Sequence, residues 1–310
     1  MLSKINDAVI AITYRCNARC RMCNIWQKEN HYNEISPEVY NMLPRDLLNI
    51  NITGGEPFLR EDLVEIVKVI VRRCPDADVI ISTNGFAVEL VCSKMKKILE
   101  IFSNISVAVS LDGIGNKHNE IRGVERGYNK VLMTITSLKA MGVKNLKVAF
   151  TLGNYNVKEL QTVYELSRFF GLEFSLAVVH SGENYFSKYN ELALNKDMIN
   201  ILSWVINKEL QTNSYKRWAR AYFAYGILKF LENGRRILPD YSGKLNIFID
   251  PCGNIYPNNV SDKSMGQLWR LDESLNFAHE VNTKNWMMCT ARAAIKKHWM
   301  RAGWWVLWNK

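Results

Sequence analysis

Three cysteines follow one another at short spacing near the start of the chain, in the run Cys16-Asn-Ala-Arg-Cys20-Arg-Met-Cys23. Three thiolates on one tight loop can ligate three irons of a four-iron cluster. The sequence has no fourth cysteine nearby, so one iron would stay open for an exogenous ligand, whereas a site closed by four thiolates suits electron transfer or structure. The alternatives are a zinc site and a chance grouping of cysteines.

The other four cysteines are scattered, at positions 74, 92, 252 and 289. An odd total of seven, in a chain whose first residues are too polar for a secretory signal, argues against a disulfide framework. The sequence contains no apolar run of the roughly 18 residues that span a bilayer. We therefore expect a cytoplasmic protein in which Cys74 and Cys92 are ordinary small buried residues.

Elements that would position the cysteine loop can be read from the alternation of short β-rich runs and helical patterns up to about residue 180. About six strand–helix units predict a parallel sheet with crossover helices. Six units are fewer than the eight of a closed TIM barrel, so we predict an α/β fold with a partial (β/α)6, TIM-like barrel. The expected strands are 8–12, 50–53, 79–82, 106–110, 146–151 and 173–178, and the expected helices begin at Ser36-Pro37-Glu38 and cover 61–73, 88–101, 128–141 and 157–170.

The pattern changes in the last third of the chain. We expect residues 1–185 to form the barrel and residues 186–310 to form a small α+β extension, with helices at 196–211 and 215–232. Two short β runs flank Asp250–Asn254, which predicts a hairpin turn. The end of the chain, 291–310, is predicted to be one basic, tryptophan-rich helix.

Further motifs follow the expected strands in order, and parallel α/β folds place their ligands at the carboxyl ends of strands. They are Thr53-Gly54-Gly55-Glu56-Pro57 after the second strand, Ser82-Thr83-Asn84-Gly85 after the third, and Ser110-Leu111-Asp112-Gly113 after the fourth, with His118 and Arg122 beyond. Together with the cysteine triplet, these elements resemble the radical SAM superfamily over roughly residues 8–180.

The resemblance implies a role for each matching residue. The triplet would hold a [4Fe–4S] cluster, and Gly54, Gly55 and Glu56 would bind or shape the site for the amino group of S-adenosylmethionine (SAM). Glycines there would let the backbone approach that group closely. Ser110 would contact the ribose or carboxylate of SAM, with Thr83 and Asn84 beside it.

Two further positions differ in how well they match the family. Met22 stands where the family has an aromatic residue against the adenine, and a thioether can pack on a ring. Arg122 is similar to arginines that pair with the SAM carboxylate, although a surface salt bridge is the alternative.

The chemistry that the resemblance implies is reductive cleavage of SAM to a 5′-deoxyadenosyl radical, which abstracts hydrogen from a substrate carbon. A low-potential electron donor such as flavodoxin or ferredoxin would be a partner. The net charge of +10 suits a phosphorylated substrate, an anionic membrane surface or nucleic acid, or only a solvated surface. No RNA-binding appendage is evident, so nucleic acid is not expected. Lys147 would face an anionic substrate inside the barrel, or be a partly exposed lysine.

The C-terminal third resembles the SPASM and twitch extensions of this superfamily, which usually hold auxiliary four-iron clusters. The resemblance rests on Asp250-Pro-Cys252-Gly-Asn-Ile-Tyr-Pro257, Met265-Gly-Gln-Leu268 and Trp286-Met-Met-Cys289-Thr. Where relatives carry cysteines, this chain has Ser242 or Gly243, Asn258 and Asn285, so no full second cluster is expected. Three interpretations stay open: a scaffold that lost its cluster, a cluster held by Cys252 and Cys289 with Asp250 or His279, or one of these two thiols as a hydrogen-atom donor to a product radical.

The terminal segment combines lysines with four tryptophans after Ile295. Such a composition can lie at a membrane interface, but we favour packing over the open side of the barrel.

For the whole chain, the leading hypothesis is a radical SAM enzyme acting on a small or medium polar substrate by dehydrogenation, epimerisation or rearrangement. A ribosomal-peptide maturase is the alternative, although the chain starts at the first strand without a leader-binding module. A structural or regulatory metal-binding protein would need neither the Gly-Gly-Glu-Pro nor the Ser-Leu-Asp-Gly motif.

Overall fold

The computed structural model describes residues 5–28, 33–182, 190, 192–270 and 285–310. Its strands are β1 (Asp7–Ala11), β2 (Asn49–Thr53), β3 (Asp78–Thr83), β4 (Ser106–Ser110), β5 (Asn145–Leu152), β6 (Glu173–Val178), β7 (Asn246–Ile249), β8 (Asn254–Tyr256) and β9 (Gly266–Gln267). They form one sheet in the order β6-β5-β4-β3-β2-β1-β7-β8-β9, which is not closed into a barrel. All pairs from β6 to β7 are parallel. The predicted partial, TIM-like barrel is therefore confirmed.

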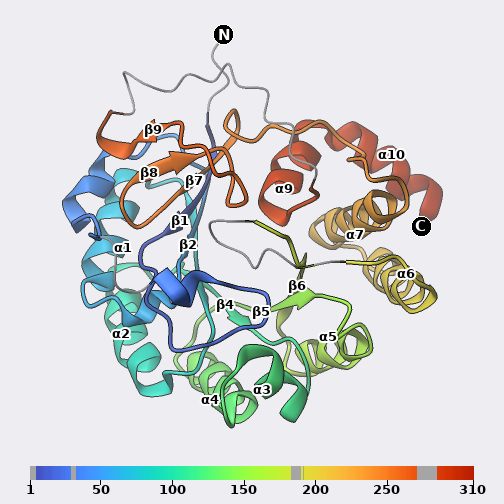
Figure 1. Ribbon diagram of the computed structural model, residues 1–310, viewed down its shortest axis with the longest axis horizontal. Helices are drawn as coiled ribbons and strands as arrows, with labels where there is room; N and C mark the ends of the chain where they lie inside the picture. The colour runs from blue at the N-terminus through green and yellow to red at the C-terminus, as the bar shows by residue number, and fades with distance from the viewer. Residues whose placement is uncertain (1–4, 29–32, 183–189, 191, 271–284) are drawn as a thin grey trace.

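Helices lie around the outside of the curved sheet (Figure 1). They are α1 (Leu63–Arg73), α2 (Val88–Ile101), α3 (Asn116–Arg122), α4 (Gly127–Ala140), α5 (Glu159–Phe169), α6 (Lys196–Leu210), α7 (Tyr215–Asn233), α9 (Met288–Lys297) and α10 (Trp299–Asn309), with short 3₁₀ helices η1 (Ile25–Lys28), η2 (Pro37–Met42), η3 (Pro57–Leu59) and η4 (Leu268–Arg270).

Three local predictions need correction. The helix expected from Ser36 is the short 3₁₀ helix η2, which ends before Leu43-Pro44, because a residue that precedes proline disfavours helical dihedrals. The expected terminal helix is broken at His298 into α9 and α10. Cys74 is buried as expected, but Cys92 in α2 is only half-buried.

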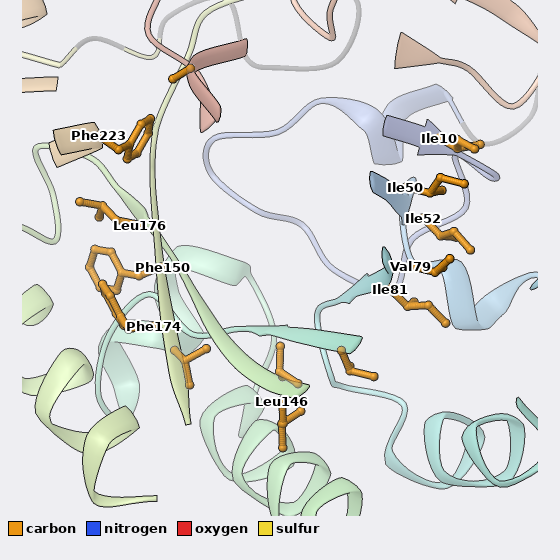
Figure 2. Close-up of a cluster of buried hydrophobic side chains, with 14 of the residues drawn as sticks. Ile10, Ile50, Ile52, Val79, Ile81, Leu146, Phe150, Phe174, Leu176 and Phe223 are labelled. Carbon is orange, nitrogen blue, oxygen red and sulfur yellow. The ribbon is translucent and has the colours of Figure 1, made fainter. Parts of the chain in front are cut away.

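The hydrophobic core lies between the sheet and the outer helices. Strand β2 reads Asn-Ile-Asn-Ile-Thr, and its two isoleucines are buried while the polar residues are half-buried; β5 and β6 alternate in the same way. Because successive strand residues point to opposite faces, one face packs on helices and the other is left polar. Figure 2 shows the apolar face, with Ile10, Ile50, Ile52, Val79 and Ile81 on successive strands and Phe150, Phe174, Leu176 and Phe223 in another part of the cluster.

The C-terminal third of the chain joins the same sheet. Strand β7 pairs in parallel with β1, and β7 and β8 form the predicted antiparallel hairpin. Residues that follow β7, including Cys252, therefore lie at the same edge of the sheet as residues that follow β1. The boundary near residue 185 stays a prediction about the change in sequence pattern.

Two helices of the C-terminal third connect the arms of the open sheet. Helix α7 contacts the edge strand β6, and α9 contacts β1, β7 and α7. Trp286, just before α9, is fully buried, donates its indole N–H to the carbonyl of Phe223 at 2.9 Å and stacks on the Phe223 ring. A Cβ atom at Gly226 of α7 would overlap the Trp286 ring, so the glycine makes room for the tryptophan.

Helix α10 packs on α7 rather than over the inner face of the sheet. Its Trp305 stacks on Tyr225 and meets Tyr222 edge-on, with ring centroids 4.7 and 5.3 Å apart. The other tryptophans of α10, Trp299, Trp304 and Trp308, are exposed. Trp305 therefore packs on α7 and not over the open side of the barrel as expected, and the other three rings pack on neither. Within the described ranges, no helix is long and apolar enough to cross a membrane.

Candidate active site

The cysteine triplet lies on a loop that leaves the carboxyl end of β1. The Cys23 amide donates to the carbonyl of Cys20 at 3.1 Å, which tightens the turn. The amides of Arg19 and Arg21 donate to the carbonyls of Arg122 and Ile121 at the end of α3, at 3.0 and 2.9 Å. Helix α3 therefore fixes the cysteine loop, and the sequence patterns gave no sign of this helix because its seven residues are mostly polar.

Burial dominates the electrostatics of the three thiols. It raises the pKa of Cys16 and of Cys23 to about 12, and it raises the pKa of Cys20 against the opposing charge of Arg122. The negative charge of one thiolate also raises the pKa of its neighbours. Buried thiols bind metal by exchanging their protons for it.

Two side chains direct N–H groups at these sulfurs. Asn84 Nδ2 lies 3.8 Å from Cys16 Sγ, and Arg122 Nη1 lies 3.7 Å from Cys20 Sγ. In the part of the chain that the structure describes, no three Cys, His, Asp or Glu residues converge tightly enough for a single metal ion. A [4Fe–4S] cluster takes each thiolate on a different iron, and three thiols on one loop, with N–H groups directed at two of them, fit that requirement.

The two glycines after β2 bring that strand's end against the segment entering the cysteine loop. The Gly55 amide donates to the Thr13 carbonyl at 2.7 Å, and the Glu56 amide donates to the Arg15 carbonyl at 2.8 Å. Gly54 has φ +151°, and a Cβ atom at either glycine would overlap the backbone of 13–15. These positions require glycine because two backbones meet there. Their expected approach to the SAM amino group stays a prediction.

Glu56 is fully buried and connects the ends of β2 and β3. Its carboxylate accepts hydrogen bonds from the Asn84 amide at 2.7 Å, from Thr83 Oγ1 at 2.8 Å and from the Phe58 amide at 3.2 Å. Burial raises the pKa of Glu56 to about 7, although these hydrogen bonds favour the charged form. The structure thus brings together three of the predicted SAM-site residues, Glu56, Thr83 and Asn84.

The raised pKa of Glu56 predicts a pH dependence of stability. The folded protein keeps this proton to about pH 7, whereas an unperturbed glutamate loses it near 4.5, so the free energy of unfolding should fall as pH rises between these values. We expect Glu56→Gln to remove up to about 3 kcal/mol of that fall. Urea unfolding at pH 5 and pH 7.5 measures it, with Glu100→Gln, on the exposed side of α2, as the control.

An unchanged pH slope in Glu56→Gln would contradict this assignment. The comparison must be between variants, because His118 acts in the opposite direction. Burial and the charge of Arg122 lower the pKa of His118 to about 3, so His118 makes the protein less stable as pH falls below about 6.5.

Asp112 organises the edge of the site at the end of β4. Its carboxylate pairs with Arg122 Nε at 2.6 Å and accepts the Thr151 amide at 2.7 Å, while its own amide donates to His118 Nδ1 at 3.1 Å. Asn156 Nδ2 donates to the Asp112 carbonyl at 3.0 Å. Arg122 is therefore held in a buried ion pair beside Cys20, and not in a surface salt bridge.

Other predicted cofactor residues lie near this edge. Ser110 is half-buried at the end of β4 and makes no side-chain hydrogen bond to the described residues. Met22 is buried in a small apolar cluster with Ile121 and Val179. A side chain that the sequence reasoning missed is Arg60, which donates to the carbonyls of Ile12 and Ile35. Its only signal was its position soon after the Gly-Gly-Glu-Pro motif.

The two remaining candidate thiols lie at opposite ends of the sheet. Cys252 follows the carboxyl end of β7. Burial raises the pKa of its thiol, and the negative charges of Asp250 and Glu34 raise it further. Cys289 is the second residue of α9 and lies near Asp7 at the start of β1, and burial raises its pKa to about 11. The structure does not bring these cysteines together. His279, the third proposed ligand, lies outside the described residues.

The inner face of the sheet is polar and half-buried. It carries Asn51 and Ser82, whose side chains hydrogen-bond at 2.8 Å, and Ser110, Thr151 and Ser175 on the strands that follow.

Charged residues lie toward the amino ends of the strands on the same face. Lys147 Nζ lies 3.7 Å from the Glu173 carboxylate, which also accepts from Arg220 of α7 at 2.7 Å. Arg292 of α9 pairs with Asp7 at 2.5 Å. Burial lowers the pKa of Lys147, the negative charge of Glu173 opposes this shift, and the charges of Arg220, Lys216 and Arg292 add to it. Cations therefore outnumber carboxylates around Lys147.

Several known proteins are similar to this chain in sequence over part of their length. A protein named Probable GTP 3',8-cyclase from Metallosphaera sedula is 29% identical over 176 residues, which cover 54% of this chain and 54% of that protein. One from Saccharolobus islandicus is 28% identical over 222 residues, 68% of this chain and 70% of that protein. Fe-coproporphyrin III synthase from Methanosarcina barkeri is 31% identical over 161 residues, 50% and 39% of the two chains. The chain thus spans about half the length of the first of these relatives.

Solved structures share the fold. Streptococcus suis SuiB bound to S-adenosylmethionine matches with a TM-score of 0.64 and 16% identity, covering 94% of this chain and 72% of SuiB. Native anSMEcpe with bound AdoMet and a peptide matches with a TM-score of 0.63 and 15% identity, covering 98% and 99% of the two chains. Residues 10–167, half of the chain, match the Radical SAM superfamily model. The protein belongs to the radical SAM superfamily, and is therefore an enzyme that uses a [4Fe–4S] cluster and SAM.

Proposed function

We propose that this enzyme abstracts hydrogen from a C–H bond of a small or medium, polar and anionic substrate that binds against the inner face of the sheet. Dehydrogenation, epimerisation or rearrangement would follow. The observation that carries the proposal is the polar inner face, which leads from Ser110 at the carboxyl edge to the cations around Lys147.

In this proposal Cys16, Cys20 and Cys23 hold the cluster, which with SAM supplies the 5′-deoxyadenosyl radical. Arg122 and Asn84 donate hydrogen bonds to its sulfur ligands, and such contacts tune a cluster's potential.

The SAM contacts are proposed for residues at the same edge of the sheet. Glu56, positioned by Gly54 and Gly55, accepts from the SAM amino group, while Ser110 contacts the ribose or the carboxylate, with Thr83 and Asn84 beside it. Met22 packs on the adenine. Arg122 keeps Asp112 as its partner and adds positive charge near the SAM carboxylate.

The position of Lys147 supports an anionic substrate. It precedes Ala149 by two residues on the inner face, and Ala149 is the register partner of Ser110. At about 3.3 Å per residue, Lys147 lies about 7 Å along the strand from the level of Ser110. A substrate of moderate length can therefore present a carbon to the SAM site while its anionic group pairs with Lys147.

The extension is proposed to be a SPASM- or twitch-like scaffold without a second cluster. The Gly243 amide donates to the Pro257 carbonyl at 3.2 Å, so the two segments that carry cysteines in relatives remain neighbours. Asn258 Oδ1 accepts from the amides of Val260 and Ser261 at 3.1 Å and so stabilises a turn at one of these positions. Of the two spare thiols, Cys252 is the candidate hydrogen-atom donor, because it follows β7 at the cluster's edge of the sheet.

The partners and the location of the enzyme are proposals as well. The electron donor is a low-potential protein such as flavodoxin or ferredoxin, and the location is cytoplasmic. A membrane contact through 291–310 rests on the exposed face of α10. A ribosomal-peptide substrate stays the alternative. Membership of an enzyme superfamily argues against a purely structural or regulatory metal protein.

The test measures 5′-deoxyadenosine formation by anaerobically reconstituted enzyme with and without GTP, an anionic probe suggested by the names of the relatives. We expect GTP to raise the rate, and Lys147→Met to raise KM for GTP at least about tenfold, the effect of losing about 1.4 kcal/mol of binding. Lys68→Met, which breaks a comparable but exposed ion pair with Glu65, is the control and should leave KM unchanged. Stimulation by uncharged peptides and not by GTP would contradict the anionic-substrate proposal.

A further inference from the structure

Building on the membrane contact included in the proposed function, we propose that α10 docks the enzyme on an anionic membrane surface. Five large apolar side chains of this helix are exposed, by 63 to 83%: Trp299, Met300, Trp304, Leu307 and Trp308, here termed the α10 face. Single exposed apolar residues are normal on proteins, but a contiguous group of this size marks an interaction site.

The α10 face is a separate side of the helix from the one that packs on the protein. Ala302 and Val306 are buried, and Trp305 stacks on Tyr225 of α7. At 100° per residue, positions 299, 300, 304, 307 and 308 cover about half of the circumference, and 302, 305 and 306 occupy the other half. Figure 1 places α10 on the outside of α7, next to the C-terminus. The helix thus presents its apolar half to the surroundings.

Basic residues accompany the α10 face and indicate the sign of the partner. Residues 285–310 contain five lysines and arginines and no aspartate or glutamate. Lys296, Lys297, Arg301 and Lys310 among them are exposed. Each basic residue near an anionic lipid surface adds about 1 kcal/mol of attraction.

An apolar face accompanied by basic residues suits a lipid interface better than a second copy of the chain. Two copies packed through the α10 face would bring the basic residues of both chains near each other, whereas anionic head groups neutralise them. Indole rings favour the level of the lipid head groups. An 11-residue helix is about 16 Å long, too short to span a bilayer, so it would lie in the plane of the interface.

Flotation of the full chain with vesicles tests the proposal, using phosphatidylcholine alone and phosphatidylcholine mixed with phosphatidylglycerol. We expect the protein to float with the anionic vesicles at low salt and to be released at high salt. The triple variant Trp304→Ser, Leu307→Ser, Trp308→Ser should bind at least about tenfold more weakly. Phe169→Ser removes an aromatic ring of α5 that is 85% exposed and should bind as the unmodified protein does.

Each variant is expected to fold, because the replaced side chains are exposed. Circular dichroism and thermal melting verify this. Light scattering after size exclusion, without lipid, tests the alternative that a second copy of the chain covers the α10 face. Failure to bind anionic vesicles, equal binding to neutral vesicles, or a dimer that the triple variant abolishes would each overturn the proposal.

Discussion

Replacing Trp286 with alanine is expected to lower the free energy of unfolding by about 3–5 kcal/mol, the range for removing a large buried aromatic side chain. The ring is fully buried, stacks on Phe223 and lies under the guanidinium of Arg236, 4.9 Å from the ring centroid. Its N–H bond to the Phe223 carbonyl would also be lost. Because Trp286 joins α7 to the start of α9, the cavity would open where the two arms of the sheet are connected.

Urea unfolding of the two proteins measures this effect. Trp308→Ala is the matched control: it removes the same side chain from a position that is 83% exposed, and it should change stability by no more than about 0.5 kcal/mol. Equal losses in the two variants would show that Trp286 does not connect the helices as described.

Local patterns were sufficient to predict the parallel part of the fold. The alternation in β2, β5 and β6 is strong because one face of each strand packs on helices. Helix α3 was missed because it buries only His118 and Ile121. The pairing of β7 with β1 was missed for a different reason: it joins residues more than 230 positions apart, and no local signal specifies such a partner.

The candidate site was predictable to the extent that its residues follow strands directly. The structure places the cysteine triplet, Glu56, Thr83, Asn84 and Arg122 at one edge, as the motifs indicate. It separates Cys252 from Cys289, since one follows the end of β7 and the other lies near the start of β1. Their separation depends on tertiary arrangement, which spacing along the chain does not reveal.

Cluster binding and SAM cleavage are expected to depend on the cysteine triplet, and Cys20 is the residue on which to test this. Its sulfur lies 3.7 Å from Arg122 Nη1, and its charge acts on both Cys16 and Cys23. With one thiolate removed, two remain on the loop, and the cluster loses one of its three protein ligands. We therefore expect loss of the cluster and of all SAM cleavage.

The most direct measurement is iron content together with 5′-deoxyadenosine formation from SAM, after anaerobic reconstitution of the unmodified chain, Cys20→Ala and Cys92→Ala. Cys92 lies in α2, away from the loop, and its variant is the control. We predict about four irons per chain and SAM cleavage for the unmodified protein and Cys92→Ala, and neither for Cys20→Ala. Full iron and full cleavage in Cys20→Ala would contradict it.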